Sequence, residues 1–132
     1  MGVTLDLYIL DIEEYNPLNF YGWENEIDDL YSYSVMLAKK FDYVVQWISE
    51  DFLTEDEMYF IRPQDSDDIE KLEDYKHYDP VKFKDIMIKI IKLLKIHDLE
   101  TYKELKKDMV NLIKLVNKAI KLNKPLGWTF SY

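Results

Sequence analysis

The chain has 132 residues, of which 48% are hydrophobic, 15% aromatic and 33% charged. A chain of this size buries roughly two thirds of its unfolded surface, and this composition is that of a folded protein. We therefore expect one globular domain over residues 1–132. The sequence contains no cysteine, which excludes disulfides, thiolate metal sites and cysteine nucleophiles. The lack of cysteine also fits a reducing compartment, so we expect a cytoplasmic protein.

The formal net charge of −9 is distributed unevenly along the chain. Residues 1–79 carry 21 Asp and Glu against 5 Lys and Arg, an excess of 16 negative charges. Residues 80–132 carry 12 Lys against 5 Asp and Glu, an excess of 7 positive charges. Charge says little about fold, but it governs which partners can approach a surface. The split predicts one strongly acidic surface and a separate lysine-rich one.

No segment has the pattern of a signal peptide or a membrane span. Asp6 and Asp11 interrupt the first hydrophobic run, where a signal peptide would have an uncharged core. The longest hydrophobic segment, residues 86–96, is interrupted by three lysines and is too short to cross a bilayer. We therefore expect no membrane partner.

Both ends of the chain are predicted to form strands. In residues 3–10 the hydrophobic side chains Val3, Leu5, Leu7 and Ile9 alternate with Thr4, Asp6 and Tyr8, which is the period of a half-buried strand. Residues 126–132 form the second candidate, entered through Lys124-Pro125. An isolated short strand is not stable. We therefore expect the two ends to pair with each other or with a middle segment.

The first half of the remaining chain is predicted to be helical. One long helix is expected over residues 26–52, with a break near Ser32 and Ser34 as an alternative. Its core face is Ile27, Leu30, Leu37, Ala38, Phe41, Val45, Ile48 and Phe52. Thr54 and Glu57 have the spacing of a capping box, which predicts a short helix through Phe60. A weakly formed acidic helix is expected over residues 67–75.

The second half is predicted to be a helical hairpin. Asp79 as N-cap and Pro80 at the first helical position begin a helix that reaches about residue 96. Asp98 caps a last helix that runs to about residue 122, and the two helices join at His97-Asp98. The helical period places one hydrophobic face on each helix: Phe83, Ile86, Met87, Ile90, Leu93 and Leu94 on the first, and Tyr102, Leu105, Met109, Leu112, Ile113, Val116, Ala119 and Ile120 on the second.

Together these elements predict a predominantly helical α+β fold. Its core is the helical hairpin, and a small sheet is formed by the N- and C-terminal strands.

A second hydrophobic stripe, Met36, Tyr43 and Trp47, lies opposite the core face of the long predicted helix. Two interpretations remain open. The helix is buried on both sides, or the stripe is an exposed anchor for a partner, because Trp, Tyr and Met are enriched where interfaces carry their binding energy. Asp29, Glu50 and Asp51 would border such an anchor.

Two dense groups of carboxylates follow the stripe: Glu55, Asp56 and Glu57, and then Asp65, Asp67 and Asp68. Carboxylates accept charge-assisted hydrogen bonds, and the tyrosines interspersed in this half offer cation–π contacts. Such a surface suits a Lys- and Arg-rich protein and can imitate the charge of a nucleic-acid backbone. The alternative for any single group is a solvated face that keeps the protein soluble.

The lysines of residues 80–132 lie opposite the buried faces of the hairpin, which predicts a solvated face. They include no arginine and few interleaved aromatic residues, so we expect no direct binding of nucleic acid. A remaining alternative is contact with the acidic half of the same chain or of a second copy.

We predict no catalytic residue, no metal and no cofactor. The run from Asp65 to Glu70 resembles the start of an EF-hand loop, but it lacks the turn glycine and the glutamate at position 12. His77 and Asp79 could form a base and the group that orients it, yet no nucleophile lies at a recognisable spacing.

In composition, this short, acidic, cysteine-free chain resembles the small inhibitors carried by phages and mobile elements, and equally bacterial immunity proteins. The resemblance covers composition and no motif, and it implies an anti-defence inhibitor or an immunity-like protein. Our first hypothesis is a non-catalytic protein that binds and blocks a basic partner, such as a nuclease or another nucleic-acid-binding protein. A structural protein that self-associates through acidic and basic faces is the alternative, and a small enzyme using His77 is a third.

Overall fold

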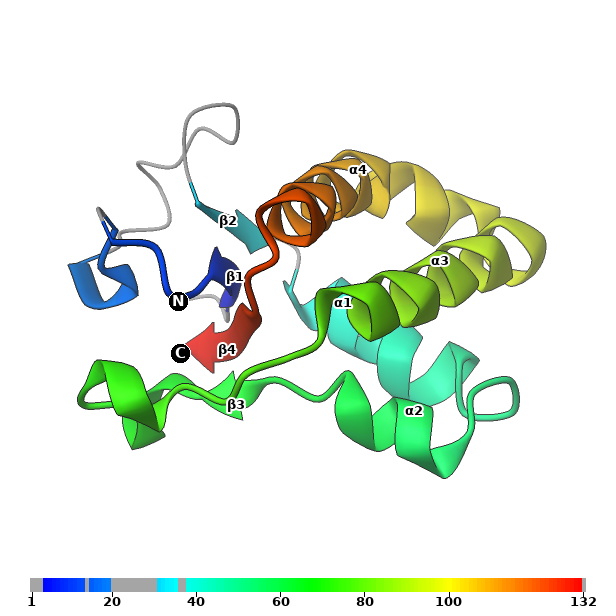
Figure 1. Ribbon diagram of the computed structural model, residues 1–132. Coiled ribbons are helices and arrows are strands. Elements are labelled where there is room, and N and C mark those ends of the chain that lie inside the picture. Colours follow the sequence, from blue (N-terminus) through cyan, green and yellow to red (C-terminus); the bar gives the residue numbers. More distant parts are fainter. Residues whose placement is uncertain (1–3, 14, 20–30, 36–37, 132) are drawn as a thin grey trace.

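A computed structural model describes residues 4–13, 15–19, 31–35 and 38–131 (Figure 1). Its described strands form one mixed sheet in the order β2-β1-β4-β3, with β1 at Thr4–Ile9, β2 at Ser32–Val35, β3 at Gln64–Asp65 and β4 at Leu126–Ser131. The two terminal strands pair antiparallel, with Leu5 opposite Phe130. The expected pairing of the chain ends and the predominantly helical α+β fold are confirmed.

The helical hairpin is also confirmed. It consists of α3 (Pro80–His97) and α4 (Leu99–Leu122). The Asp79 carboxylate accepts a hydrogen bond from the Val81 N–H (3.0 Å) at the start of α3. Asp98 accepts one from the Thr101 N–H (3.1 Å) at the start of α4, and Asn123 ends α4 in the left-handed conformation with φ of 55°. Both helices of the hairpin therefore begin at the capping residues that the sequence predicts, and the left-handed Asn123 ends the second one.

The hairpin covers one face of the sheet and forms the main core with it (Figure 1). Most of the predicted inner positions are buried, whereas Leu93, Tyr102, Ile113 and Ile120 are half-buried. Trp128 on β4 is completely buried and meets Phe41 and Phe83 edge-on, at ring centroid distances of 6.0 and 5.4 Å. An aromatic contact thus joins the sheet to both the hairpin and the first half of the chain.

The single long helix predicted over residues 26–52 is wrong. Ser32–Val35 is strand β2, which pairs antiparallel with β1 and places Ser34 opposite Asp6. Among the described residues of this stretch, the first helix is α1 (Ala38–Tyr43), and Ile27, Leu30 and Leu37 lie outside the described residues. Strand β1 supplies backbone partners that the sequence of residues 32–35 does not reveal, and tertiary pairing overrides the local pattern.

A π-helical segment, η3 (Val44–Ile48), follows α1 and changes which side chains face the core. The Ser49 N–H bonds to the Val44 carbonyl five residues earlier, at 3.1 Å. This wider turn buries Val44, Ser49 and Leu53 and leaves Phe52 51% exposed. The predicted core position of Phe52 is therefore wrong, and its ring stacks on His97 at 4.9 Å between centroids.

The next two predictions have opposite outcomes. The capping box is confirmed: Thr54 caps α2 (Glu55–Phe60), and the Thr54 hydroxyl and Glu57 carboxylate exchange hydrogen bonds with each other's backbone N–H. The acidic helix over residues 67–75 is wrong. Two short 3-10 turns, η4 (Ser66–Asp68) and η5 (Leu72–Asp74), occupy this stretch, because Asp65 and Asp74 accept bonds from nearby backbone N–H groups.

The prediction that β1 is half-buried is wrong as well, because its second face is covered. Tyr8, Leu10 and Tyr75 form a small buried cluster there, and Tyr15 and Ile69 pack against it. Tyr15 comes shortly before η1 (Pro17–Asn19), and Ile69 and Tyr75 directly follow the 3-10 turns η4 and η5. The sheet is thus enclosed between the hairpin and a thin layer of loops and turns.

Candidate functional site

A groove of about 600 Å³ opens beside α1 and η3 and is called here the Trp47 groove. Its floor includes hydrophobic residues from the ends of β1 and β4, and one wall comes from α2 and the residues after it. The lining residues are Leu5, Ala38, Lys39, Asp42, Gln46, Trp47, Glu50, Met58, Arg62, Pro63 and Phe130. Segments far apart in the sequence therefore meet at one surface.

Trp47 is the most informative residue of this groove. Its side chain is 68% exposed, and that of Tyr43 is 47% exposed. The interpretation of a helix buried on both sides therefore fails at these two positions. Met36 and Asp29, the other predicted members of the stripe and its border, lie outside the described residues. An exposed tryptophan at the mouth of a groove has the size and shape of an interface anchor.

Carboxylates stand beside Trp47 on the helical wall. Asp42, Gln46 and Glu50 follow one another at four-residue intervals and all line the groove. The Gln46 amide donates to the Asp42 carboxylate at 2.8 Å, and Asp51 is exposed just beyond. Lys39 and Arg62 also line the groove, so its own border is of mixed charge. On the helical wall that carries the indole, the carboxylates Asp42 and Glu50 line the groove together with one cation, Lys39.

Two buried hydrogen-bond donors hold the wall that follows α2. The indole N–H of Trp128 donates to the Ile61 carbonyl at 2.9 Å, and the Tyr78 hydroxyl donates to the Arg62 carbonyl at 2.7 Å. Phe60 meets Tyr78 edge-on at 5.7 Å between ring centroids. Residues 61 and 62 are thereby hydrogen-bonded to β4 and to Tyr78, which itself bridges to Leu126 of β4, and these bonds hold the wall that contains Arg62.

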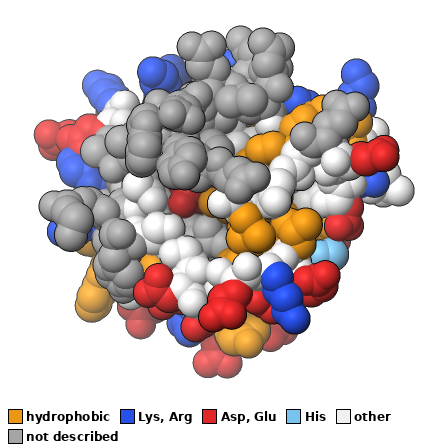
Figure 2. All heavy atoms as spheres, turned by 90° about the vertical axis from the view of Figure 1, so that its left-hand side faces the viewer, with side chains coloured by type: hydrophobic (Ala, Val, Ile, Leu, Met, Phe, Trp, Pro, Cys, Tyr) orange, Lys and Arg blue, Asp and Glu red, His pale blue; other side chains and the backbone are white. Residues whose placement is uncertain are grey.

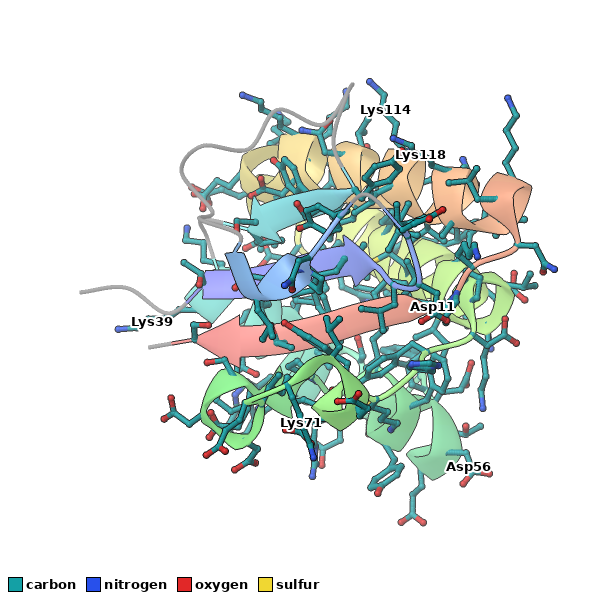
Figure 3. All side chains as sticks on the ribbon, turned by 60° about the vertical axis from the view of Figure 1, so that its left-hand side comes forward. Asp11, Lys39, Asp56, Lys71, Lys114 and Lys118 are labelled. Carbon is teal, nitrogen blue, oxygen red and sulfur yellow. The ribbon has the colours of Figure 1, made fainter. Side chains whose placement is uncertain are left out.

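The predicted carboxylates of α2 divide into two roles. Glu55 and Asp56 are exposed, and Figure 3 shows Asp56 pointing away from the molecule. Glu57 instead pairs with Lys89 of α3 at 2.6 Å and closes the capping box. The hydrogen bond from Lys89, followed by that from the Thr54 N–H, lowers the pKa of Glu57. Glu57 therefore stabilises the fold, and its two neighbours face solvent.

The second acidic group divides in the same way. Asp65 is half-buried and caps η4 through the Asp67 N–H (3.0 Å), whereas Asp67 and Asp68 are exposed. Figure 2 shows acidic side chains gathered along the lower part of the face it presents. The exposed carboxylates of residues 50–74 include Glu50, Asp51, Glu55, Asp56, Asp67 and Asp68 and are called here the acidic side, and Glu50 also lines the Trp47 groove.

The lysines of α4 lie at the opposite end. Lys114 and Lys118 project from α4 in Figure 3, far from Asp56. Within the described residues, two ion pairs join the acidic and basic halves, Lys40 with Glu104 and Lys89 with Glu57. The two halves of the chain therefore also meet, α1 with α4 and α2 with α3.

A buried carboxylate, Asp6, lies on the second face of the sheet. It is 6% exposed and accepts hydrogen bonds from Ser34 and, at 3.4 Å, from the Thr4 hydroxyl. Burial raises the pKa of Asp6, and the surrounding hydroxyls oppose this effect. Because Asp6 lies outside the lining of the Trp47 groove, we treat it as a structural group.

The structure adds no support to the alternative of a small enzyme that uses His77. The Asp79 carboxylate that would orient His77 is engaged by the Val81 N–H. In the described ranges, no three His, Asp or Glu residues are arranged to hold a metal ion. Within these ranges, no helix is long and hydrophobic enough to cross a bilayer.

Neither protein-family models, nor curated proteins, nor solved structures gave a match to this chain. The site is therefore interpreted from its own chemistry. Sequence reasoning missed Met58, Pro63 and Phe130 as parts of the groove, because only the folded chain brings them to Trp47.

Proposed function

We propose that this protein is a non-catalytic interaction protein that binds a basic, nucleic-acid-binding partner in the cytoplasm and blocks it. The observation that carries the proposal is the 68% exposure of Trp47 at a groove whose helical wall bears Asp42 and Glu50. Exposed tryptophans at groove edges are the side chains that most often anchor protein interfaces. The surrounding carboxylates specify a partner rich in lysine or arginine.

The two parts of the surface contribute differently to binding. Burying an exposed indole stabilises a complex by about 2–4 kcal/mol. Exposed carboxylates such as Glu50, Asp51 and Glu55 each contribute less, but together they accelerate association and select a positively charged partner. The indole thus provides affinity, and the acidic side provides selectivity.

Blocking follows from what a basic partner uses its surface for. Lysines and arginines that neutralise phosphates in a nucleic-acid site can be neutralised by carboxylates at similar positions. The acidic side formed by residues 50–74 would occupy that site sterically and electrostatically. Binding of the protein and of nucleic acid to the partner would then be mutually exclusive.

The test begins with affinity capture from the native host, followed by binding measurements with the purified partner. Trp47→Ala is expected to weaken binding by about 10- to 100-fold, the range of an interface anchor. Leu122→Ala, at a 41% exposed hydrophobic residue at the end of α4, is the matched control and should leave affinity unchanged. Equal affinities of wild type and Trp47→Ala would remove the groove from the interaction.

The blocking step has its own readout. The purified partner is titrated with labelled nucleic acid in the presence and absence of this protein. Competition is expected, and Glu55→Gln with Asp56→Asn should weaken it while Glu57 keeps its structural contacts. Simultaneous binding of both ligands would contradict the proposed blocking.

A further inference from the structure

A second groove, of about 310 Å³, runs along the seam between α3 and α4 and is called here the lysine groove. Its floor is hydrophobic and includes Ile88, Ile91 and Val110, the last of which is 46% exposed. Lys106 and Lys114 line it from α4. This groove is not part of the site described above.

The border of the lysine groove is predominantly positive. On α3, Lys84 and Lys92 lie four residues before and after Ile88, which places them on the same side of the helix. Lys95 lies over the ring of Tyr102, another lining residue, at 5.1 Å from the ring centroid. Asp85 is the single carboxylate of α3. An occupant must therefore present hydrophobic surface together with negative charge.

The same chain carries a surface of that description. Tyr43 and Trp47 are exposed on a helical segment that continues into the exposed carboxylates Glu50 and Asp51. We call these four residues the Trp47 ridge. It is an exposed, acidic and aromatic surface, and its chemistry complements a hydrophobic floor flanked by lysines.

We propose that the Trp47 ridge of one copy docks into the lysine groove of a second copy. The indole would cover the floor at Val110, and Glu50 and Asp51 would meet Lys106 and Lys114. Charge complementarity between two surfaces of one chain selects this occupant.

Ridge and groove are different surfaces, so the contact joins copies head to tail. Every dimer keeps one free ridge and one free groove, and further copies can add. The contact does not depend on the proposed function. It does use Trp47, so a copy whose ridge is occupied cannot bind a partner through the Trp47 groove.

Complementation between two variants tests the docking directly. Val110→Asp disrupts the floor of the groove and keeps the ridge, whereas Trp47→Ala disrupts the ridge and keeps the groove. Sedimentation velocity of the wild type should show a mass that rises with protein concentration, from micromolar to millimolar, and falls at high salt. Each variant alone should remain a monomer, with an unchanged far-ultraviolet circular dichroism spectrum.

An equimolar mixture of the two variants should form a one-to-one dimer, in which the ridge of Val110→Asp occupies the groove of Trp47→Ala. The dimer should not grow further, because no intact ridge or groove is left free. A wild type that stays monomeric at millimolar concentration would overturn the proposal. A mixture that stays monomeric would also overturn it.

Anionic vesicles of phosphatidylserine and phosphatidylcholine test whether a lipid surface occupies the lysine groove. Vesicle binding by a monomeric wild type, lost in Val110→Asp, would assign the groove to a membrane and overturn the proposed occupant. The mixing experiment contains no other protein, so its failure leaves the proposed partner binding untouched. Conversely, a partner insensitive to Trp47→Ala leaves the self-association standing.

Discussion

The hydrogen bond from Trp128 to the Ile61 carbonyl makes a specific prediction about stability. Trp128 is completely buried and Ile61 is 1% exposed, so no water can replace a lost donor. Trp128→Phe keeps an aromatic ring between Phe41 and Phe83 but removes the indole N–H. An unsatisfied buried carbonyl costs about 1–3 kcal/mol. The smaller ring leaves a void that adds about 1 kcal/mol.

Tyr78→Phe is the matched comparison, because it removes a donor from the neighbouring carbonyl. Burial raises the pKa of Tyr78 to about 12, so its hydroxyl is protonated and donates to Arg62 at neutral pH. The bond from Tyr78 to the Arg62 carbonyl is only part-buried, whereas the bond from Trp128 is buried, so water can more readily replace the Tyr78 donor. The expected loss is about 0.5–1.5 kcal/mol. Trp128→Phe should therefore destabilise the protein more than Tyr78→Phe does.

Urea unfolding followed by far-ultraviolet circular dichroism measures both variants without relying on tryptophan fluorescence. Shifts of the midpoint at constant slope report the change in the free energy of unfolding. Equal losses for the two variants, or a larger loss for Tyr78→Phe, would refute the argument that burial of the acceptor decides the cost.

Three further changes are expected to alter stability in defined directions, each measured by the same unfolding assay. Thr54→Ala removes one side of the capping box and should cost about 1 kcal/mol, whereas Thr54→Ser should restore most of it. Asn123→Ala places a side chain unsuited to a φ of 55° at the end of α4 and should cost about 1 kcal/mol, whereas Asn123→Gly should not. Burial raises the pKa of Asp6, so the folded state holds the proton of this carboxyl more tightly than the unfolded state does. The stability that Asp6 contributes is therefore fully present below its ordinary pKa of 3.8, and it is lost as the pH rises through the folded-state pKa. Asp6→Asn should therefore gain stability relative to the wild type as the pH rises from 3.8 to neutrality, and a constant difference would contradict this.

Local signals predicted the elements that carry their own capping residues. Asp79 with Pro80, Asp98 and the Thr54–Glu57 pair each act through hydrogen bonds to the backbone within a few residues, so their effect is readable from sequence. The terminal strands were predictable for a similar reason, because alternation of side chains in β1 needs no knowledge of the rest of the chain. The instability of lone strands predicted that each would pair with the other or with a middle segment, and β1 pairs with both β4 and β2.

The errors arose where distant parts of the chain decide local structure. Ser32–Val35 becomes a strand because β1 lies beside it, and β1 is covered on both faces because Tyr15 and Tyr75 pack over it. The π-helical turn shifts the helical period by about one residue, which exposes Phe52 and buries Leu53. None of these contacts is encoded within one element.

The site was predicted in part. The acidic half and Trp47 were identified from charge and residue type, but exposure of Trp47 depends on whether another layer covers it. Glu57 and Asp65 were predicted to contact a partner, which stays a prediction, and the structure shows that each also accepts a local hydrogen bond from a backbone N–H. Composition cannot distinguish a carboxylate that caps a helix from one that faces solvent.

The salt dependence of partner affinity tests the central claim most directly. For the purified partner, the dissociation constant should rise at least tenfold between about 0.05 and 0.5 M NaCl, because the Debye length falls from about 14 to 4 Å. The Glu55→Gln, Asp56→Asn variant should bind more weakly at low salt and respond less to added salt. An affinity that stays constant over this range would contradict an acidic surface that recognises a basic partner.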